Sequence, residues 1–142
     1  MQVQDQLVEL LVQTMRDMRR HYDNAARENG LTLARARVIS AVRRDEGASQ
    51  AQIAHALEIE GPTLKKLVDA LEERGFIERR DDPTDGRRKT LYLTASGRDT
   101  RVADLGRRLR SDMVEGIAAE DLKTTCEVLR RMGDNMNRPA QP

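Results

Sequence analysis

Three cations stand side by side in the segment DDPTDGRRKTLYLT, which covers residues 81–94. Arg87, Arg88 and Lys89 directly follow DPTDG, a stretch rich in turn-forming residues, so their side chains are free to reach outward. An Arg at such a tip can enter the narrow, electronegative minor groove of DNA, while neighbouring cations contact phosphates. Asp85 can pair with Arg87 and hold its rotamer. A hydrated, charged hairpin is the alternative interpretation of the same residues.

A second set of polar residues is expected on a helix that starts near residue 62. Its apolar residues recur at i, i+3, i+4 and i+7 from Leu64, which defines one buried face. Lys66 and Thr63 would then face base edges, and Lys65 would meet a phosphate. An ordinary hydrated helix face is the alternative. The outward residues of the first turns are Pro62, Thr63, Lys65 and Lys66.

A third set lies at the start of the preceding short helix. Ser49 and Gln52 fit the S-x-x-Q capping box, in which each side chain bonds the other residue's free backbone N–H. Free N–H groups at a helix start also favour a phosphate oxygen. Ser49, Gln50 and Gln52 are therefore candidate phosphate contacts, and simple capping explains the same residues equally well.

The elements that must position these residues follow from hydrophobic spacing and turn signals. The pattern predicts helix, helix, short helix, capped helix, β-hairpin, helix, helix. The fold class is mainly α with a minor β part, and the middle of the chain matches a winged helix-turn-helix, whose second helix enters the major groove. The expected helices cover 7–26, 32 or 33 to about 46, 49 to about 57, 62–74, 94 or 96 to about 115, and about 119–136.

Composition allows this interpretation and narrows the alternatives. The chain has 142 residues, a net charge of +1 and 38% hydrophobic residues, so any affinity for nucleic acid must come from local charge. The low apolar content suggests that some helices complete their burial against a second chain. No apolar run has membrane-spanning length and no signal peptide is evident, so we expect a soluble, cytoplasmic protein.

Catalytic and metal-binding motifs are not found in the sequence. No nucleophile elbow, phosphate loop or paired catalytic carboxylate is recognisable, so an enzyme is not expected, and no cofactor is implied. His21 and His55 are too few and badly spaced to form a metal site with Cys126. Cys126 is the only cysteine, and its place on an apolar helical stripe predicts a buried side chain that acts as a small hydrophobe.

The residues 49–97 resemble the core of the MarR family of bacterial transcription regulators. The helix segment IEGPTLKKLVDALEERGFIER and the wing DPTDGRRKTLYLT carry the likeness, which is strongest to the SlyA-type branch. The wing pattern of the family is D-x-R followed by a Leu-Thr pair, here Asp85, Arg87, Leu93 and Thr94. Element order and length match over nearly the whole chain. Gly86 stands where the family often has an Arg, and Ala36 where it often has an aromatic residue.

The resemblance implies one domain over residues 1–142. Its winged helix-turn-helix would cover about 31–94, and dimerisation helices would cover about 5–28 and 95–137. It implies an obligate homodimer on a pseudo-palindromic operator in double-stranded DNA. Many members release DNA when a small anionic aromatic effector binds, and His21, Tyr22 and Arg37 are candidate effector contacts. Interhelical packing and salt bridges are the alternative role of these three residues.

The sequence therefore favours a dimeric, sequence-specific DNA-binding transcription regulator. A low-specificity architectural or anti-silencing DNA binder is an alternative with the same surfaces. A winged helix that docks a protein partner is a further alternative, although Lys65 and Lys66 argue against it. Both repression and activation are compatible with the sequence.

Overall fold

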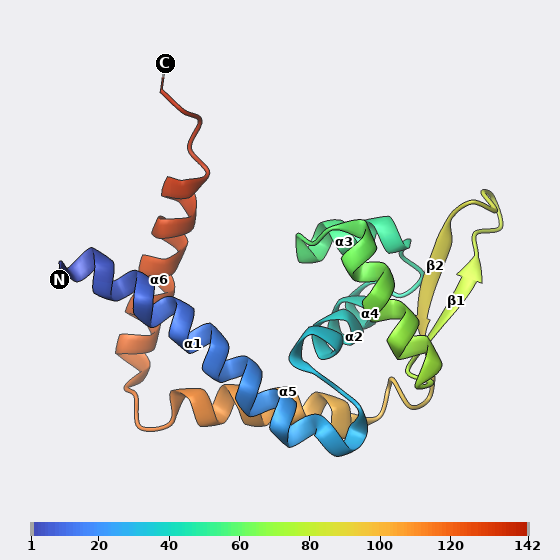
Figure 1. The fold of residues 1–142 in the computed structure, drawn as a ribbon, viewed down its shortest axis with the longest axis horizontal. Helices are drawn as coiled ribbons and strands as arrows, with labels where there is room; N and C mark the ends of the chain where they lie inside the picture. The colour runs from blue at the N-terminus through green and yellow to red at the C-terminus, as the bar shows by residue number, and fades with distance from the viewer. Residues whose placement is uncertain (1, 142) are drawn as a thin grey trace. The chain divides into compact units, whose positions relative to one another are not determined.

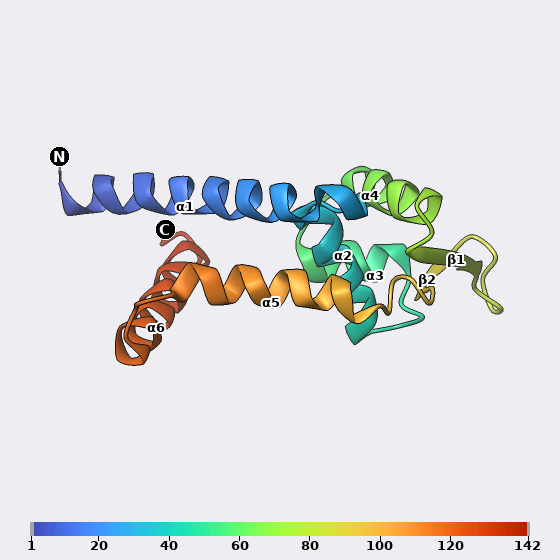
Figure 2. The same ribbon diagram turned by 90° about the horizontal axis from the view of Figure 1, so that it is seen from below.

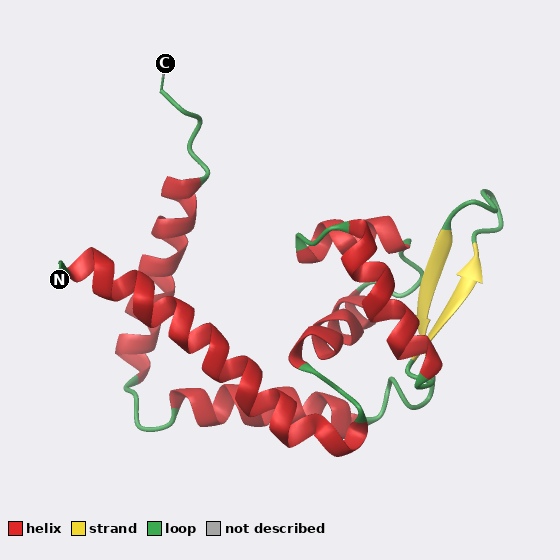
Figure 3. Cartoon of the chain, in the orientation of Figure 1, coloured by secondary structure: helices red, strands yellow, loops and turns green. Residues whose placement is uncertain are grey.

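A computed structural model describes residues 2–141 of the chain, and helices dominate it (Figure 3). The chain divides into two compact units, one that reaches to Leu109 and one that begins at Arg110. The prediction of a single domain over the whole chain stays a prediction. The elements are α1 (Val3–Ala26), a short 3-10 helix η1 (Arg27–Asn29), α2 (Leu33–Arg44), α3 (Gln50–Leu57), α4 (Gly61–Glu73), β1 (Ile77–Asp81), β2 (Lys89–Leu93), α5 (Thr100–Val114) and α6 (Ala119–Met136).

The core of the first unit lies between α2, α3, α4 and the hairpin. Val38 and Ile39 of α2 are fully buried, as are Leu64 and Val68 of α4 and Leu91 of β2. Leu64 and Val68 lie at i and i+4 of the buried face that the sequence pattern assigns to this helix. The mainly helical winged helix-turn-helix fold is therefore confirmed.

The hairpin is attached to the start of α3 by backbone hydrogen bonds. β1 and β2 pair antiparallel with Ile77 opposite Leu93, and the connection at residues 82–88 projects away from the helices (Figure 1). The N–H of Leu91 donates to the carbonyl of Ala48 at 2.9 Å, and the N–H of Gly47 donates to the carbonyl of Leu91 at 2.8 Å. The base of the wing is thus held against the turn that leads into α3.

Most predicted helix boundaries agree with the structure to within a few residues, and the starts of α1 and α5 differ most. α4 begins one residue earlier than expected, with Glu60 as its N-cap and Gly61 as its first residue, so Pro62 is in the second position. Prolines are tolerated there because that N–H has no partner within the helix.

The helix after the wing begins later than expected. Thr94 and Ser96 lie in a turn instead, in which the hydroxyl of Thr94 accepts from the N–H of Gly97 at 3.1 Å. A Cβ added to Gly97 would lie 2.2 Å from the carbonyl oxygen of Phe76, so the turn passes close to the backbone before β1. α5 starts at Thr100, where the carboxylate of Asp99 accepts from the N–H of Arg101 at 2.9 Å.

α1 is a single long helix of which only the C-terminal part is buried. It starts at Val3, earlier than the apolar spacing indicates, and its buried residues are Tyr22 and Ala26. Its N-terminal part extends away from α2, α3 and α4 (Figure 2). Apolar side chains on this part are left uncovered, as shown by Val8 at 59% exposure and Leu10 at 56%.

The second unit contains α6 and the last turns of α5. α6 has no buried residue, and Leu129 on its apolar stripe is 42% exposed. The prediction that Cys126 is buried is wrong for the single chain, because its side chain is exposed. Met113 of α5 is also exposed, at 44%. No helix in residues 2–141 is both long enough and apolar enough to cross a membrane.

Candidate nucleic-acid interface

The first turns of α4 present the polar face that the sequence predicts. Pro62, Thr63, Lys65 and Lys66 are all exposed, while Leu64 between them is fully buried. The ammonium of Lys65 donates to the carboxylate of Asp69 at 2.9 Å, one helical turn away. Among the described residues, no carboxylate lies within ion-pair distance of Lys66. Lys66 can therefore contact a ligand without first losing an ion pair, whereas Lys65 must give up its bond to Asp69.

The wing tip is shaped by two aspartates that bond the backbone. The carboxylate of Asp85 accepts from the backbone N–H of Arg87 at 3.0 Å, and that of Asp82 accepts from the N–H of Thr84 at 2.9 Å. The hydrogen bonds from the Thr84 backbone and then its hydroxyl hold the pKa of Asp82 below its usual value. The expected pairing of Asp85 with the Arg87 side chain is not seen, because Asp85 stabilises the turn itself.

The three cations of the wing differ in their surroundings. The guanidinium of Arg88 lies 4.0 Å from the carboxylate of Asp82, and Lys89 forms an ion pair with Asp81 across the hairpin. Arg87 is exposed at the tip, and within residues 2–141 no carboxylate is in ion-pair range of its guanidinium. The geometry therefore leaves Arg87 as the wing side chain with freedom to enter a groove.

The start of α3 combines a buried cap with exposed neighbours. Both bonds of the capping box are present, from the N–H of Gln52 to the Ser49 hydroxyl at 3.1 Å and from the N–H of Ser49 to the Gln52 side chain at 2.9 Å. Ser49 is only 3% exposed and its hydroxyl holds the cap, and a direct phosphate contact by this side chain stays a prediction. Gln50 is half-buried and Gln52 exposed.

An open groove joins the start of α3 to the wing. Gln52 and His55 of α3 line it together with Arg88. The wing cation and the helix start, which are distant in sequence, therefore form one continuous surface. The remaining lining residues are Asp45, Ser49 and Ala51.

Arg79 is a residue of this region that the sequence interpretation missed. Its side chain is 17% exposed, and its guanidinium bonds Gln50 at 2.7 Å, Asp69 at 2.5 Å and Glu72 at 3.1 Å. The period-two alternation of β1 carries a usable signal, because it puts Arg79 on the same side of the strand as buried Ile77. A charged side chain at such a position requires partners.

The candidate effector residues differ in exposure. His21 and Arg37 are exposed, whereas Tyr22 is 1% exposed in the core. Burial, and secondarily the charge of Asp23, raises the pKa of Tyr22 above its usual value. The Tyr22 hydroxyl has no hydrogen-bond partner among the described residues. The Tyr22 ring fills the core, and ligand contact by its hydroxyl stays a prediction.

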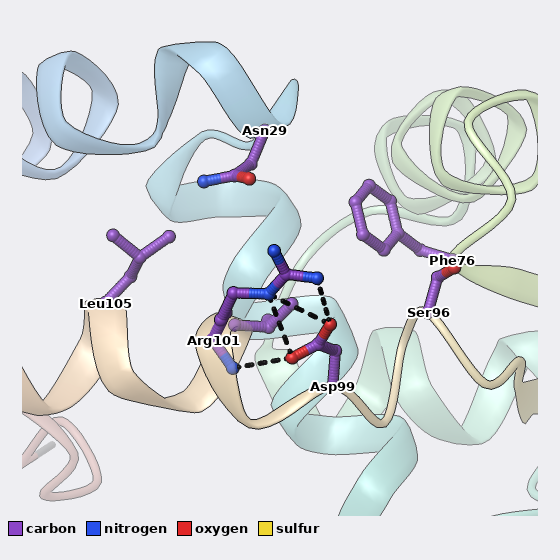
Figure 4. Close-up of a pocket in the computed structure, with 7 residues that line it drawn as sticks. Asn29, Phe76, Ser96, Asp99, Arg101 and Leu105 are labelled. Carbon is purple, nitrogen blue, oxygen red and sulfur yellow. Dashed lines mark hydrogen bonds and ion pairs between the residues drawn. The ribbon is translucent and has the colours of Figure 1, made fainter.

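A recess of about 160 Å³ is lined by residues that include Phe76, Arg101 and Leu105 (Figure 4). None of the three candidate effector residues lines it. Arg101 and Asp99 both line this recess, and the guanidinium of Arg101 donates to the carboxylate of Asp99 at 2.8 Å. Phe76 and Leu105 supply apolar walls. Within the described part of the chain, no group of three or more His, Cys, Asp or Glu residues is arranged to hold a metal ion.

Comparison with known proteins identifies the segment that carries these surfaces. Residues 29–88 match the family model described as the MarR family. This range includes α2, α3, α4, β1 and the wing tip up to Arg88. It therefore contains most of the candidate interface.

Solved structures share the fold of nearly the whole chain. A probable transcriptional regulator from Pseudomonas aeruginosa is 24% identical, with a TM-score of 0.82, and the match covers 92% of this chain and 99% of that one. The MepR–DNA complex of S. aureus is 23% identical, with a TM-score of 0.81, covering 90% and 96%. PcaV of Streptomyces coelicolor, solved with its natural ligand, is 23% identical, with a TM-score of 0.74, covering 87% and 89%.

Proposed function

We propose that this chain, whose residues 29–88 match the MarR family, is a sequence-specific, DNA-binding transcription regulator that acts as a homodimer. The observation that carries the proposal is the pair of exposed cations without carboxylate partners in the described chain, Lys66 on α4 and Arg87 on the wing tip. Helix α4 would enter a major groove of double-stranded DNA and the wing the flanking minor groove.

The remaining contacts divide by the kind of group they would meet. Lys66 and Thr63 would read base edges, since an ammonium donates to guanine and a Thr methyl contacts the thymine methyl. Lys65, Arg88, Lys89 and the start of α3 would contact phosphates, which position the protein without reading sequence. Gln50 and Gln52 supply the polar groups at that helix start.

Two copies are needed to read a pseudo-palindromic operator, and the exposed apolar faces support such a dimer. Apolar side chains of α1 are uncovered in the first unit, and those of α6 in the second. We assign the winged helix-turn-helix to about 31–94 and dimerisation to helices within about 5–28 and 95–137. The wing pattern supports a place in the SlyA-type branch.

A small anionic aromatic effector is proposed to modulate DNA binding. PcaV was solved with its natural ligand, and the recess beside Arg101 offers a cation and apolar walls. His21 and Arg37 stay candidate contacts at the surface. A regulator of this kind needs no cofactor, performs no catalysis and works in the cytoplasm, where the DNA lies.

The proposal is tested by selecting bound fragments from genomic DNA and then titrating salt against the selected duplex. Affinity should fall steeply with salt, because phosphate contacts release counterions. Arg87→Ala should weaken binding to most sequences, whereas Lys66→Ala should also relax base preference, by about 1–3 kcal/mol for a lost base contact.

Arg74→Ala, at the far end of α4, removes the same charge and serves as the control. If the Lys66 and Arg87 variants bind like this control, the assigned surfaces are wrong. A discrete palindromic footprint supports an operator regulator, and diffuse protection supports the architectural alternative. A protein that ignores duplex DNA would instead favour the protein-docking alternative.

A further inference from the structure

One stripe of α4 is charged where the helix meets β1. Lys65, Asp69 and Glu72 are spaced by four and three residues, so they lie along one line of the helix surface, beside the apolar stripe that faces the core. Arg79 of β1 lies against this line, with its side chain only 17% exposed. Ion pairs therefore join β1, the strand that leads into the wing, to α4.

The contacts of Arg79 connect three elements. Its Nε donates to the side-chain oxygen of Gln50 in α3 at 2.7 Å, and its two terminal nitrogens donate to Asp69 at 2.5 Å and Glu72 at 3.1 Å in α4. The backbone N–H of Arg79 also donates to the second oxygen of Glu72 at 3.2 Å. A planar guanidinium can satisfy this geometry, and a single ammonium cannot.

The same network reaches the DNA-facing turns. Asp69 accepts from Lys65 at 2.9 Å while it is held by Arg79. A terminal nitrogen of Arg79 also lies 3.5 Å from the Lys65 carbonyl oxygen. The place of Lys65 in space is thus set from the strand side as well as by its own helix.

We propose that Arg79 is a positioning residue for DNA recognition, which holds the base-reading turns of α4 at a fixed spacing from the wing without touching DNA itself. This inference rests on the proposed function. The helix and the wing bind different grooves, so both engage a specific site only when the joint between them is rigid. A loose joint still allows phosphate contacts, so its loss costs sequence discrimination more than general affinity.

A charge effect and a positioning effect predict different results when Arg79 and Glu72 are replaced in turn. Arg79→Ala removes a positive charge and Glu72→Ala a negative one, so charge alone would weaken DNA binding in the first variant and strengthen it in the second. Positioning predicts that both variants lose discrimination. The neighbours Arg80 and Glu73, both exposed, provide charge-matched controls on the same strand and helix.

The experiment measures Kd of the full chain for the selected operator duplex and for a scrambled duplex of equal length. The Kd for the scrambled duplex divided by the Kd for the operator should fall by about tenfold in Arg79→Ala and in Glu72→Ala, the size of one lost base contact. This ratio should stay within about twofold of wild type in Arg80→Ala and Glu73→Ala, because the partners of Arg80, Glu78 and Tyr92, lie within the hairpin and do not join it to α4. Arg79→Lys should restore binding to the scrambled duplex but not the ratio.

Amide hydrogen exchange of the free protein gives a readout that needs no DNA. Exchange over residues 62–67 should be faster in Arg79→Ala than in Arg80→Ala. Glu72→Ala keeps the test open should Arg79→Ala fail to fold, since the Glu72 side chain is 43% exposed.

Two outcomes overturn the inference in distinguishable ways. Equal ratios in each variant and its matched control, with normal wild-type binding, overturn the positioning role alone. A wild-type protein that binds no duplex overturns the proposed function together with it.

Discussion

Neighbouring charged residues in this chain have different partners, and their sequence positions alone do not separate them. Arg79 is enclosed by carboxylates of α4, whereas Arg80 lies 3.9 Å from the centre of the Tyr92 ring and pairs with Glu78. Arg88 is near Asp82, whereas Arg87 beside it extends from the tip. A single position along a strand or turn thus decides whether a cation supports the framework or is available to a ligand.

We expect Glu46 to make the stability of the fold depend on pH in the acid range. It accepts from the Arg98 side chain and from the Leu93 N–H at 3.0 Å, and chiefly the Arg98 hydrogen bond holds the pKa of Glu46 below its usual 4.5. A lowered pKa stabilises the fold above the unfolded value, and the stabilisation is lost as pH falls through the folded value. The Tm of wild type should therefore decline below about pH 5 more steeply than that of Glu46→Gln.

Thermal denaturation followed by circular dichroism between about pH 7 and about pH 3 measures this difference. Glu73→Gln removes an exposed carboxylate on α4 and should follow the wild-type curve. Parallel curves for wild type and Glu46→Gln would show that the contact with Arg98 contributes no pH-dependent stability.

At the scale of elements, helix ends and turns decide where each surface begins. Thr32 caps α2 by accepting from the N–H of Arg35 at 3.2 Å, and Ser49 caps α3. Gly75 follows the end of α4 with a φ of 79°, in the left-handed range that favours glycine. The turn between β2 and α5 crosses the carbonyl of Phe76, which already accepts from the N–H of Thr94 at 3.1 Å. That carbonyl therefore cannot move aside freely.

Gly97→Ala should destabilise the first unit for this reason. The added Cβ would lie 2.2 Å from the Phe76 carbonyl oxygen, so the turn or the strand must shift. We expect a loss of about 1–3 kcal/mol in the free energy of unfolding, measured by urea denaturation. Gly86→Ala is the control, because a Cβ there meets nothing within 4 Å, and it should change stability by less than about 0.5 kcal/mol. Equal stability of both variants would mean that the close approach is not maintained in solution.

At the scale of the whole molecule, the single chain leaves several large apolar side chains uncovered. Val3 is 78% exposed, Val8 59% and Leu10 56% on α1, and Val128 of α6 is 46% exposed. Exposed apolar side chains along a helix are what a protein–protein contact would cover. A second copy of the chain is the partner that the operator-binding proposal requires.

Sedimentation analysis should accordingly give twice the chain mass of 16.1 kDa. Leu10→Asp should shift the protein toward the monomer, since a charge would be buried in the contact. Gln13→Asp introduces the same side chain on exposed α1 and should leave the dimer intact. A wild-type protein that sediments as a monomer at micromolar concentration would refute the dimer. It would also refute the proposal that two subunits each bind one half of a pseudo-palindromic operator.

The sequence by itself determined the features that depend on nearby residues. Apolar spacing predicted the helices, and S-x-x-Q predicted both bonds of the α3 cap. The apolar spacing from Leu64 predicted the buried face of α4, on which Leu64 and Val68 are fully buried. Propensity, capping and amphipathic periodicity act over a few residues, so one sequence window contains their cause. The exposure of Lys66 and Arg87 followed from the same local patterns.

Only the tertiary structure decided which distant groups meet. Arg79 binds α3 and α4 across 29 and 10 residues of sequence, Tyr22 fills the core, and the turn at Gly97 places the start of α5 at Thr100. These outcomes depend on how elements pack, and packing brings together residues whose separation along the chain carries no periodic signal. A buried charge or ring takes the role that its three-dimensional neighbours allow, because desolvation must be offset by partners that local sequence does not name.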